Sequence, residues 1–424
     1  MADLTSDFLG IKSPNPFWLA SAPPTDKAYN VNRAFEAGWG GVVWKTLGEV
    51  GPPIVNVSGP RYSAMHSNDR RVIGFNNIEL ITDRPLETNL EEIRQIKRDW
   101  PGRALVVSVM LPMNEKAWAD HVPMIEDTGA DALELNFGCP HGMSERGMGA
   151  AVGQVPEYIQ MATEWCKKAA SIPVIVKLTP NVASVVPPAK AAKDGGADAV
   201  SLINTVNSIM RVNYDTLTMY PTTDGMGTHG GYCGEAVKPI ALNMVAEIAR
   251  SADTRGIPIS GIGGISDWRD AVDFLALGAS NVQVCTAAMV YGFKIIDDLT
   301  DGLSTFLDDK GMTAVSELVG KAVPSVTDWQ YLNLNYVEKA VIDQDLCIKC
   351  GRCHIVCEDT SHQAITNSVN GERHFEVIDD ECVGCNLCVC VCPVDKCITM
   401  KQVPNELAPG NWTEHPNNPM RKTK

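Results

Sequence analysis

The chain has 424 residues, of which 45% are hydrophobic and 21% are charged, and this balance excludes a disordered or fibrous protein. Its formal net charge of −15 argues against binding to nucleic acid or to an anionic membrane, because either would repel it. The N-terminus has no secretory pattern and no segment reaches ~18 uninterrupted apolar residues, so we expect a soluble, cytoplasmic protein.

The first 300 residues contain apolar runs of strand length that recur at regular intervals. Eight such runs are present, at residues 17–23, 41–46, 104–110, 131–138, 173–179, 199–205, 257–264 and 281–287. Amphipathic stretches lie between them, with apolar residues at the i, i+3 and i+4 spacing of a helix. This alternation is typical of a parallel sheet covered by helices, and eight units predict a closed (β/α)8 TIM barrel over residues 1–310.

An open, doubly wound sheet is the alternative fold. Its usual G-x-G-x-x-G signature after the first strand is absent, and the turn GIGG at 261–264 lacks that spacing and follows the seventh strand instead. After the barrel we expect a helical connector over 311–335, a small α+β domain over 336–400 and an extended C-terminal tail over 401–424.

Chemistry in such barrels takes place where the strands end, and two lysines lie at these ends. Lys45 and Lys177 each close a run of otherwise apolar residues, where an unpaired ammonium group would be costly. Together they suit the electron-rich edge of a flavin ring, whereas either lysine alone is equally well explained as a rim residue that reaches solvent. The glycine-rich turns at 229–234 and 261–264 offer backbone amides for the phosphate of a mononucleotide.

Fourteen cysteines are present, and ten of them lie between Cys347 and Cys397. They include two runs with the spacing C-x2-C-x2-C-x3-C, the pattern of a two-cluster bacterial ferredoxin, in which the fourth cysteine of each run binds the other run's cluster. The pattern therefore assigns one 4Fe–4S cluster to Cys347, Cys350, Cys353 and Cys392, and a second to Cys382, Cys385, Cys388 and Cys357.

Zinc is the alternative metal, but zinc sites usually have two separated cysteine pairs rather than two consecutive runs of four. Cys390 and Cys397 are not needed as ligands, and we expect both to be buried thiols near the clusters. Because clusters carry single electrons whereas most organic reductions need two, their combination with a barrel raises the possibility of a flavin that converts between the two regimes.

One cysteine outside this domain, Cys139, follows a predicted strand in the stretch NFGCPHGMSERGMG. An inert packed thiol, a metal ligand, a nucleophile and a proton donor are the roles open to it. A long polar loop above a barrel is an unusual place for a purely structural thiol, so we favour a role in the reaction.

Between residues 5 and 400 the sequence contains, in order, the motifs LASAPPT, VWKTLGE, FNNIEL, LELNFGCPHGMSERGMG, VKLTPN, NTVNS, HGGYCG and GIGGI, followed by the cysteine runs. In these motifs the chain resembles the dihydroorotate and dihydropyrimidine dehydrogenase family, and as a whole it resembles the bacterial NAD-dependent dihydropyrimidine dehydrogenases. NFGCPHGM is the most specific motif. The resemblance implies reduction of the C5=C6 bond of uracil and thymine, the first step of reductive pyrimidine catabolism.

The resemblance also implies which residues bind the cofactor and the substrate. FMN would be held by Ala20, Ser21, Lys45, Thr46, Lys177, Gly231, Gly263, Gly264, Cys285 and Thr286. The pyrimidine would be held by Asn77, Glu79, Asn136, Asn204 and Thr205. Asparagine amides match the alternating N–H and C=O groups of a neutral ring, which argues against orotate-like substrates, because their carboxylate would call for a cation. Gly138 departs from the family, since many members have a serine there, so one polar contact of the pocket is not expected.

In the implied reaction FMN delivers hydride to C6, and Cys139 gives the proton to C5. A thiol with an ordinary pKa near ~8.5 is mostly protonated at pH 7 yet acidic enough to transfer its proton. His141 is expected to assist the thiol, with a loop-stabilising hydrogen bond as an equal alternative. Two other functions stay open: a dihydroorotate dehydrogenase-like oxidoreductase acting on another cyclic amide, and an electron-transfer subunit whose barrel is a docking scaffold.

The sequence has no dinucleotide fingerprint, so NADH is expected to be oxidised on a different polypeptide. The expected partner is an iron–sulfur subunit that binds FAD and NADH and passes electrons to this chain's clusters, in a heterotetramer. The remaining expected ligand is the small pyrimidine substrate, with no nucleic acid and no membrane.

Overall fold

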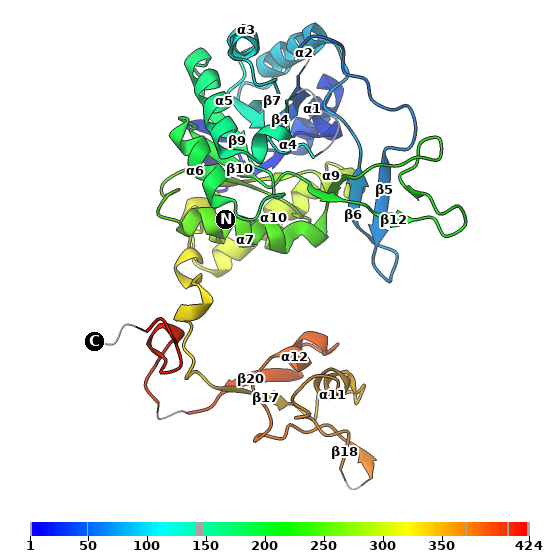
Figure 1. Ribbon diagram of the computed structural model, residues 1–424, viewed down its shortest axis with the longest axis vertical. Helices are drawn as coiled ribbons and strands as arrows, with labels where there is room; N and C mark the ends of the chain where they lie inside the picture. Colours follow the sequence, from blue (N-terminus) through cyan, green and yellow to red (C-terminus); the bar gives the residue numbers. More distant parts are fainter. Residues whose placement is uncertain (1, 49, 141–146, 370, 405–406, 422–424) are drawn as a thin grey trace. The chain divides into compact units, whose positions relative to one another are not determined.

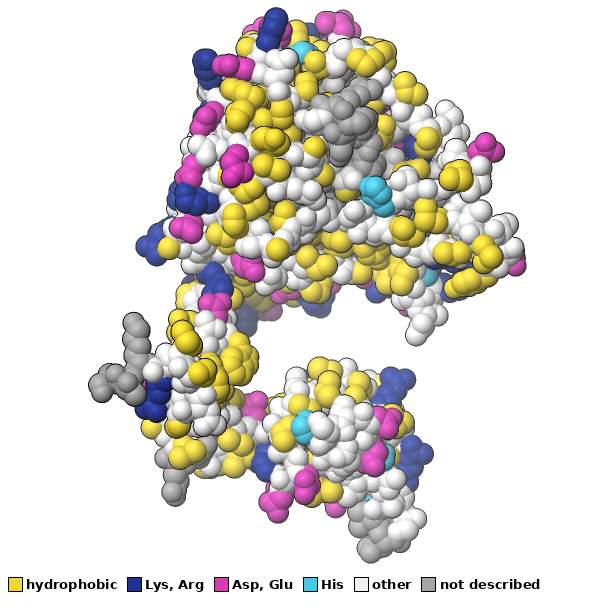
Figure 2. All heavy atoms as spheres, viewed as in Figure 1, with side chains coloured by type: hydrophobic (Ala, Val, Ile, Leu, Met, Phe, Trp, Pro, Cys, Tyr) yellow, Lys and Arg dark blue, Asp and Glu magenta, His cyan; other side chains and the backbone are white. Residues whose placement is uncertain are grey.

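The computed structural model describes residues 2–48, 50–140, 147–369, 371–404 and 407–421. The chain forms two units, Met1–Val326 and Thr327–Lys424 (Figure 1). On the face of the first unit seen in Figure 2, Lys and Arg side chains are interspersed with Asp and Glu side chains.

In the described part of the first unit, eight parallel strands close into a barrel in the spatial order β10-β15-β16-β3-β4-β7-β8-β9. Their bounds are β3 (Phe17–Leu19), β4 (Gly41–Leu47), β7 (Ala104–Val109), β8 (Ala132–Asn136), β9 (Val174–Lys177), β10 (Ala199–Leu202), β15 (Ile259–Ile262) and β16 (Asn281–Val284). Each strand coincides with one of the predicted runs. Because β16 pairs with β3 and closes the ring, the (β/α)8 prediction is confirmed and the open sheet is excluded.

Helices cover the outside of the barrel and bury their apolar faces against it (Figure 1). In α2, for example, Leu90, Ile93 and Ile96 lie three residues apart on one buried face. The helices of this unit in the described residues are α1 (Ala28–Ala37), α2 (Leu86–Asp99), α3 (Glu115–Glu126), α4 (Ala150–Gly153), α5 (Pro156–Ala169), α6 (Val186–Asp194), α7 (Lys238–Arg250), α8 (Trp268–Ala276), α9 (Thr286–Tyr291) and α10 (Ile295–Asp309).

Side chains that point into the barrel form an apolar layer and, above it, a polar layer. The apolar layer includes Trp18, Val43, Val106, Ala132, Ile175 and Ala199. Phe8, from the hairpin of β1 (Ser6–Phe8) and β2 (Ile11–Ser13), contacts Trp18 edge to face at 5.8 Å and covers this layer. Two residues further along the strands, where side chains return to the same face, the polar layer contains Lys45, Ser108, Glu134, Lys177 and Ser201.

A four-stranded antiparallel sheet lies at the C-terminal ends of the barrel strands. Its order is β11-β14-β6-β5, with the bounds β5 (Tyr62–His66), β6 (Val72–Asn77), β11 (Val206–Ser208) and β14 (Gly230–Cys233). Strands β5 and β6 come from the connection after β4, whereas β11 and β14 come from the connection after β10, as does the hairpin β12 (Arg211–Val212) and β13 (Met219–Tyr220). The pairing of β6 with β14 therefore joins two distant parts of the chain over the barrel mouth.

The second unit contains the small α+β arrangement that the sequence predicts. A two-stranded antiparallel sheet joins the two ends of the cysteine-dense region, and a short helix begins within each cysteine run. The elements are β17 (Glu338–Ile342), α11 (Arg352–Glu358), β18 (Ser368–Val369), β19 (Glu372–Arg373), α12 (Leu387–Val391) and β20 (Ile398–Gln402).

The segments on either side of this region differ from expectation. In residues 311–335, where we expect a helical connector, the helical elements are the short 3-10 turns η4 (Val315–Glu317), η5 (Val323–Ser325) and η6 (Trp329–Tyr331). Two glycines in positive φ, Gly311 and Gly320, interrupt a helix there. The described tail is not simply extended either: Trp412, in η7 (Trp412–Glu414), lies against Trp329 with ring centroids 6.1 Å apart, because an aromatic ring in the tail gains contact with a second ring there.

Candidate active site

A cavity lies between the C-terminal ends of the barrel strands and the four-stranded sheet, and it encloses about 1280 Å³, part of it open to solvent. Of the residues that the sequence points to, the cavity is lined by Ala20, Ser21, Lys45, Thr46, Asn77, Glu79, Asn136, Cys139, Lys177, Asn204, Thr205, Gly263, Gly264, Cys285 and Thr286. Gly231 is not among the lining residues, and His141 lies outside the described residues.

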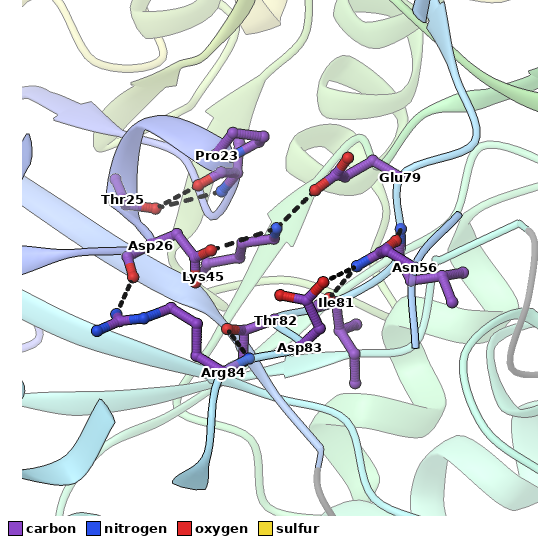
Figure 3. A network of polar contacts seen from close by, with 12 residues as sticks. Pro23, Thr25, Asp26, Lys45, Asn56, Glu79, Ile81, Thr82, Asp83 and Arg84 are labelled. Atoms are coloured by element: carbon purple, nitrogen blue, oxygen red, sulfur yellow. Dashed lines mark hydrogen bonds and ion pairs between the residues drawn. The ribbon is translucent and has the colours of Figure 1, made fainter. Parts of the chain in front are cut away.

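Lys45 and Thr46 both contribute to this site because the pairing of β4 with β7 is irregular at this point. Lys45 is only 5% exposed, and its Nζ lies 2.9 Å from Oε1 of Glu79 and 3.6 Å from Oδ2 of Asp26 (Figure 3). Burial raises the pKa of Asp26, and the charge of Lys45 partly opposes this rise. Two carboxylates thus hold the Lys45 ammonium group at the cavity wall.

Lys177 enters the cavity from the end of β9 and is also 5% exposed. Its Nζ lies 3.3 Å from Oε1 of Glu134, a fully buried residue of the same polar layer. A buried ammonium group is costly unless an opposite charge compensates it. Lys45 and Lys177 together place two ammonium groups, each paired with a carboxylate, at this wall of the cavity, which fits the edge of a flavin ring that gains negative charge on reduction.

The glycine turn after β15 fits the phosphate of the same cofactor. Gly263 and Gly264 have φ angles of 129° and 83°, a region that glycine alone adopts readily. A Cβ atom at Gly264 would lie 2.9 Å from the carbonyl oxygen of Gly234. The turn at 261–264 therefore approaches the other glycine-rich turn, at 229–234, closely. Turns that follow the seventh strand of a barrel commonly bind phosphate through their backbone amides. The residues present therefore fit FMN.

The asparagines at the cavity are held by hydrogen bonds. Nδ2 of Asn136 donates to Oγ1 of Thr46 at 3.0 Å, and Nδ2 of Asn204 donates to Oδ1 of Asn136 at 2.9 Å. Asn77, on the four-stranded sheet, donates from Nδ2 to the carbonyl oxygen of Gly231 at 3.0 Å. Gly231 therefore supports the cavity wall from behind, and the amides are fixed in position to present donors and acceptors to a ring.

Cys139 and Gly138 follow β8 at the cavity. Cys139 lines the cavity and packs in a small apolar cluster with Ile54, Ile81, Met110 and Met148. A Cβ atom at Gly138 would lie 2.5 Å from Cβ of Asn204, so a serine does not fit at this position with Asn204 where it is. The thiol-bearing residue thus reaches the cavity from an apolar wall beside the asparagines.

The four-stranded sheet supplies cavity residues that the sequence alone did not point to, namely Tyr62, Phe75, Tyr232 and Cys233. Burial and the neighbouring charge of Glu79 raise the pKa of Tyr62, and burial raises the pKa of the Cys285 thiol to about 12. The strands β5 and β14 carry little sequence signal, because both are short, and β14 pairs with β6, a strand from a distant part of the chain.

In the second unit the cysteines surround two cavities. One encloses about 320 Å³ and is lined by Cys347, Cys350, Cys353 and Cys392. The other encloses about 370 Å³ and is lined by Cys357, Cys382, Cys385 and Cys388. The fourth cysteine of each run thus lies with the first three of the other run. Within the described ranges, no three His, Cys, Asp or Glu side chains form a group able to hold a single metal ion.

The backbone between the cysteines has the same conformation in both runs. Lys349 and Gly351 have φ angles of 57° and 82°, and the equivalent Gly384 and Asn386 have φ angles of 71° and 68°. Residues in this region turn backbone amides toward a common point, an arrangement found around iron–sulfur clusters. The repeated conformation fits one cluster in each cavity.

The two extra cysteines of this domain have different environments. Cys397 is buried and lines the first cysteine cavity, as expected. Cys390 is exposed, so the prediction of a buried thiol there is wrong. The reason is helical geometry, because Cys388 occupies the inward face of α12 and Cys390 lies two residues further around it.

Fold and site together define a dehydrogenase-type barrel joined to an iron–sulfur unit. Residues 3–307 match the dihydroorotate dehydrogenase family and residues 340–400 match the 4Fe-4S dicluster domain. The chain belongs to the dihydroorotate dehydrogenase family, which confirms the resemblance found in the motifs. Across the residues that the structure describes, every helix is too short or too polar to span a membrane.

Three relatives and one solved structure illustrate this membership. The chain is 40% identical to the NAD-dependent dihydropyrimidine dehydrogenase subunit PreA of Escherichia coli K12, over 95% of this chain and 96% of the relative. It is 38% identical to the chloroplastic dihydropyrimidine dehydrogenase (NADP(+)) of Arabidopsis thaliana, over 82% of this chain and 83% of the relative. It is 36% identical to the catalytic subunit of dihydroorotate dehydrogenase B (NAD(+)) of Pyrococcus abyssi, over 76% of this chain and 99% of the relative. The crystal structure of DHODH from Eimeria tenella with ferulenol shares the fold, with a TM-score of 0.62 and 20% identity over 75% of this chain and 88% of that one.

Proposed function

We propose that the chain is the pyrimidine-reducing subunit of an NAD-dependent dihydropyrimidine dehydrogenase, and that it reduces the C5=C6 bond of uracil and thymine. The cavity at the barrel mouth carries the proposal, because it gathers Lys45, Lys177, Cys139 and the asparagines around one space. The relative PreA, which this chain matches over nearly its whole length, supports the same assignment.

The wall that carries Lys45 and Lys177 and the glycine turn would together hold the FMN. Lys45 and Lys177 would contact its ring and Gly263 and Gly264 its phosphate, while Ala20, Ser21, Thr46, Gly231, Cys285 and Thr286 would complete or support this part of the site. When bound, FMN supplies the hydride for C6 of the pyrimidine. The glycine turn anchors the phosphate through backbone amides, and the two lysines orient the ring and balance the charge that it gains.

The asparagines and Thr205 hold the pyrimidine ring, whose edge alternates N–H and C=O groups. Asn77, Asn136 and Asn204 supply amide donors and acceptors, with Glu79 beside them. Within the described lining residues the cations are Lys45 and Lys177, and each already has a carboxylate partner. An orotate-type carboxylate would therefore find no unpaired cation in this wall, which favours a neutral ring.

Cys139 donates the proton to C5. As C6 receives hydride, negative charge develops on C5 and O4; the S–H bond of Cys139 breaks, the C5–H bond forms, and the thiolate then regains a proton from solvent or from His141. The position of Cys139 in the cavity wall, next to the asparagines that hold the ring, supports this role.

The cysteine domain delivers the electrons. We assign one 4Fe–4S cluster to each cysteine cavity, and propose that the clusters receive electrons from a partner subunit that binds FAD and NADH, in a heterotetramer. We place the barrel domain at residues 1–310 and the cluster domain at 336–400. A cytoplasmic location is supported by the many reduced thiols that the clusters need.

A second candidate is dihydroorotate oxidation, favoured by the match of residues 3–307 to the dihydroorotate dehydrogenase family. The test is an anaerobic assay of the purified chain with uracil, thymine and dihydroorotate side by side, together with FMN and iron analysis. Bound FMN and turnover of uracil or thymine support the proposal. Faster turnover of dihydroorotate would replace it with the second candidate, and a chain that binds no FMN would be an electron-transfer subunit instead.

A further inference from the structure

A buried carboxylate lies directly beneath the cofactor wall. Glu134 has no solvent exposure and is not among the residues that line the cavity. It stands on β8 two residues before Asn136, so its side chain points into the barrel, one layer below the site. Its Oε1 lies 3.3 Å from Nζ of Lys177. The ion pair thus connects the buried layer to the cavity.

The other oxygen of Glu134 is fixed by two donors. Oγ of Ser201 donates to Oε2 at 2.8 Å, and Nε2 of Gln283 donates to the same atom at 2.9 Å. Gln283 also donates to Oγ of Ser260 at 3.0 Å. These bonds orient the carboxylate, so that Oε1 is directed at Lys177 and accepts no hydrogen bond within the described residues.

We propose that Glu134 is a positioning residue that lowers the reduction potential of the bound FMN, by holding the ammonium group of Lys177 from beneath and offsetting part of its charge. This inference rests on the proposed function, since it requires FMN in the cavity. Reduction adds negative charge near Lys177, and the positive charge of Lys177 favours it. Glu134 opposes that effect, and burial strengthens the opposition because little water screens the pair.

Glu134→Gln removes the charge while keeping the shape. The surrounding network can accommodate the amide, because Oε1 of Gln283 has no hydrogen-bond partner within the described residues and can accept from it after a flip of the Gln283 amide. Ser201→Ala is the matched control: it removes one hydrogen bond to Glu134 from the same buried layer and leaves every charge in place.

The experiment is an anaerobic potential titration of the full chain, following flavin absorbance against a reference dye while EPR reports the clusters separately. Glu134→Gln should raise the FMN midpoint potential by about 30 mV or more, which is a tenfold change in the ratio of reduced to oxidised cofactor for a two-electron couple. Ser201→Ala should change that ratio less than about threefold.

An unchanged potential in FMN-loaded Glu134→Gln overturns the inference, and so does an equal shift in Ser201→Ala, because packing would then set the potential. If Glu134→Gln does not accumulate, Glu134→Asp tests the inference instead. Its shorter side chain weakens the ion pair with Lys177 and should raise the FMN potential by a smaller amount. An unchanged FMN potential in Glu134→Asp would overturn the inference. Wild-type chain without FMN would instead contradict the proposed function, so the two failures are distinguishable.

Discussion

Gly138 leaves the space that Asn204 occupies, since a Cβ atom at Gly138 would lie 2.5 Å from Cβ and 2.7 Å from Nδ2 of Asn204. Gly138→Ala should therefore displace Asn204 and break its 2.9 Å hydrogen bond to Asn136. Loss of about one hydrogen bond to the ring predicts a roughly tenfold higher KM for uracil with FMN content unchanged. Gly102→Ala, where an added Cβ meets no atom within 4 Å, is the control. Equal KM values for both variants would show that Asn204 does not hold the ring.

Cys139→Ala should leave FMN, clusters and pyrimidine binding nearly intact, because the side chain is small and the ring is held by amides. Turnover should fall by about 100-fold or more, the scale for removal of a general acid. Cys139→Ser should be nearly as slow, since a hydroxyl keeps the shape but is a much weaker acid. Stopped-flow measurement of flavin reoxidation by uracil in a single turnover checks this. Reoxidation at the wild-type rate in Cys139→Ala would move the search for the proton donor to His141.

Two neighbouring cysteines provide a matched test of the cluster assignment. Cys392 lines the first cysteine cavity, whereas Cys390 is exposed. The intact chain should contain about eight iron atoms, and Cys392→Ser should lose up to about four of them or change one of the two EPR signals. Cys390→Ser should retain the wild-type iron content and spectrum. Zinc in the wild-type chain, or iron loss from Cys390→Ser, would contradict the assignment.

The isolated chain should reduce uracil with a reduced artificial donor but not with NADH. The reason is that the sequence has no dinucleotide fingerprint. Addition of the FAD-containing partner subunit should restore NADH-dependent turnover, measured as NADH oxidation under anaerobic conditions. Efficient NADH oxidation by this polypeptide alone would remove the need for a partner.

Thiol alkylation should distinguish buried from exposed cysteines. Burial raises the pKa of Cys285 to about 12, so at pH 8 only about one thiol in 10,000 is a reactive thiolate there. Cys390, which is exposed, should react first with iodoacetamide, and mass spectrometry of the labelled holoprotein identifies the site. Because the pKa of Cys285 is raised, its labelling should increase only as the pH approaches that value. Rapid labelling of Cys285 at pH 8 would show that the cavity wall opens.

The sequence alone determined the barrel, because each strand of a parallel barrel is buried on both faces and is therefore mainly apolar. The strand β9, for example, lies within the run predicted at 173–179. The sequence also predicted which cysteines belong together, since cluster geometry restricts the spacing of ligands within a run. Lys45 and Lys177 could also be recognised in the sequence, because each places a charge at the end of an apolar run.

Only the tertiary structure decided what lies around these residues. The four-stranded sheet that brings Tyr62 and Cys233 to the cavity depends on pairing between connections far apart in the chain, and short strands carry little local signal. Glu134 looks like any polar residue in a strand, and its contact with Lys177 exists because β8 pairs with β9, while its hydrogen bond from Gln283 on β16 depends on closure of the barrel. The contact of Trp412 in the tail with Trp329 is likewise decided by the tertiary structure, because the two aromatic rings are distant in sequence. Local composition determines which segments are buried, whereas the partners of a buried charge are set by the closure of the fold.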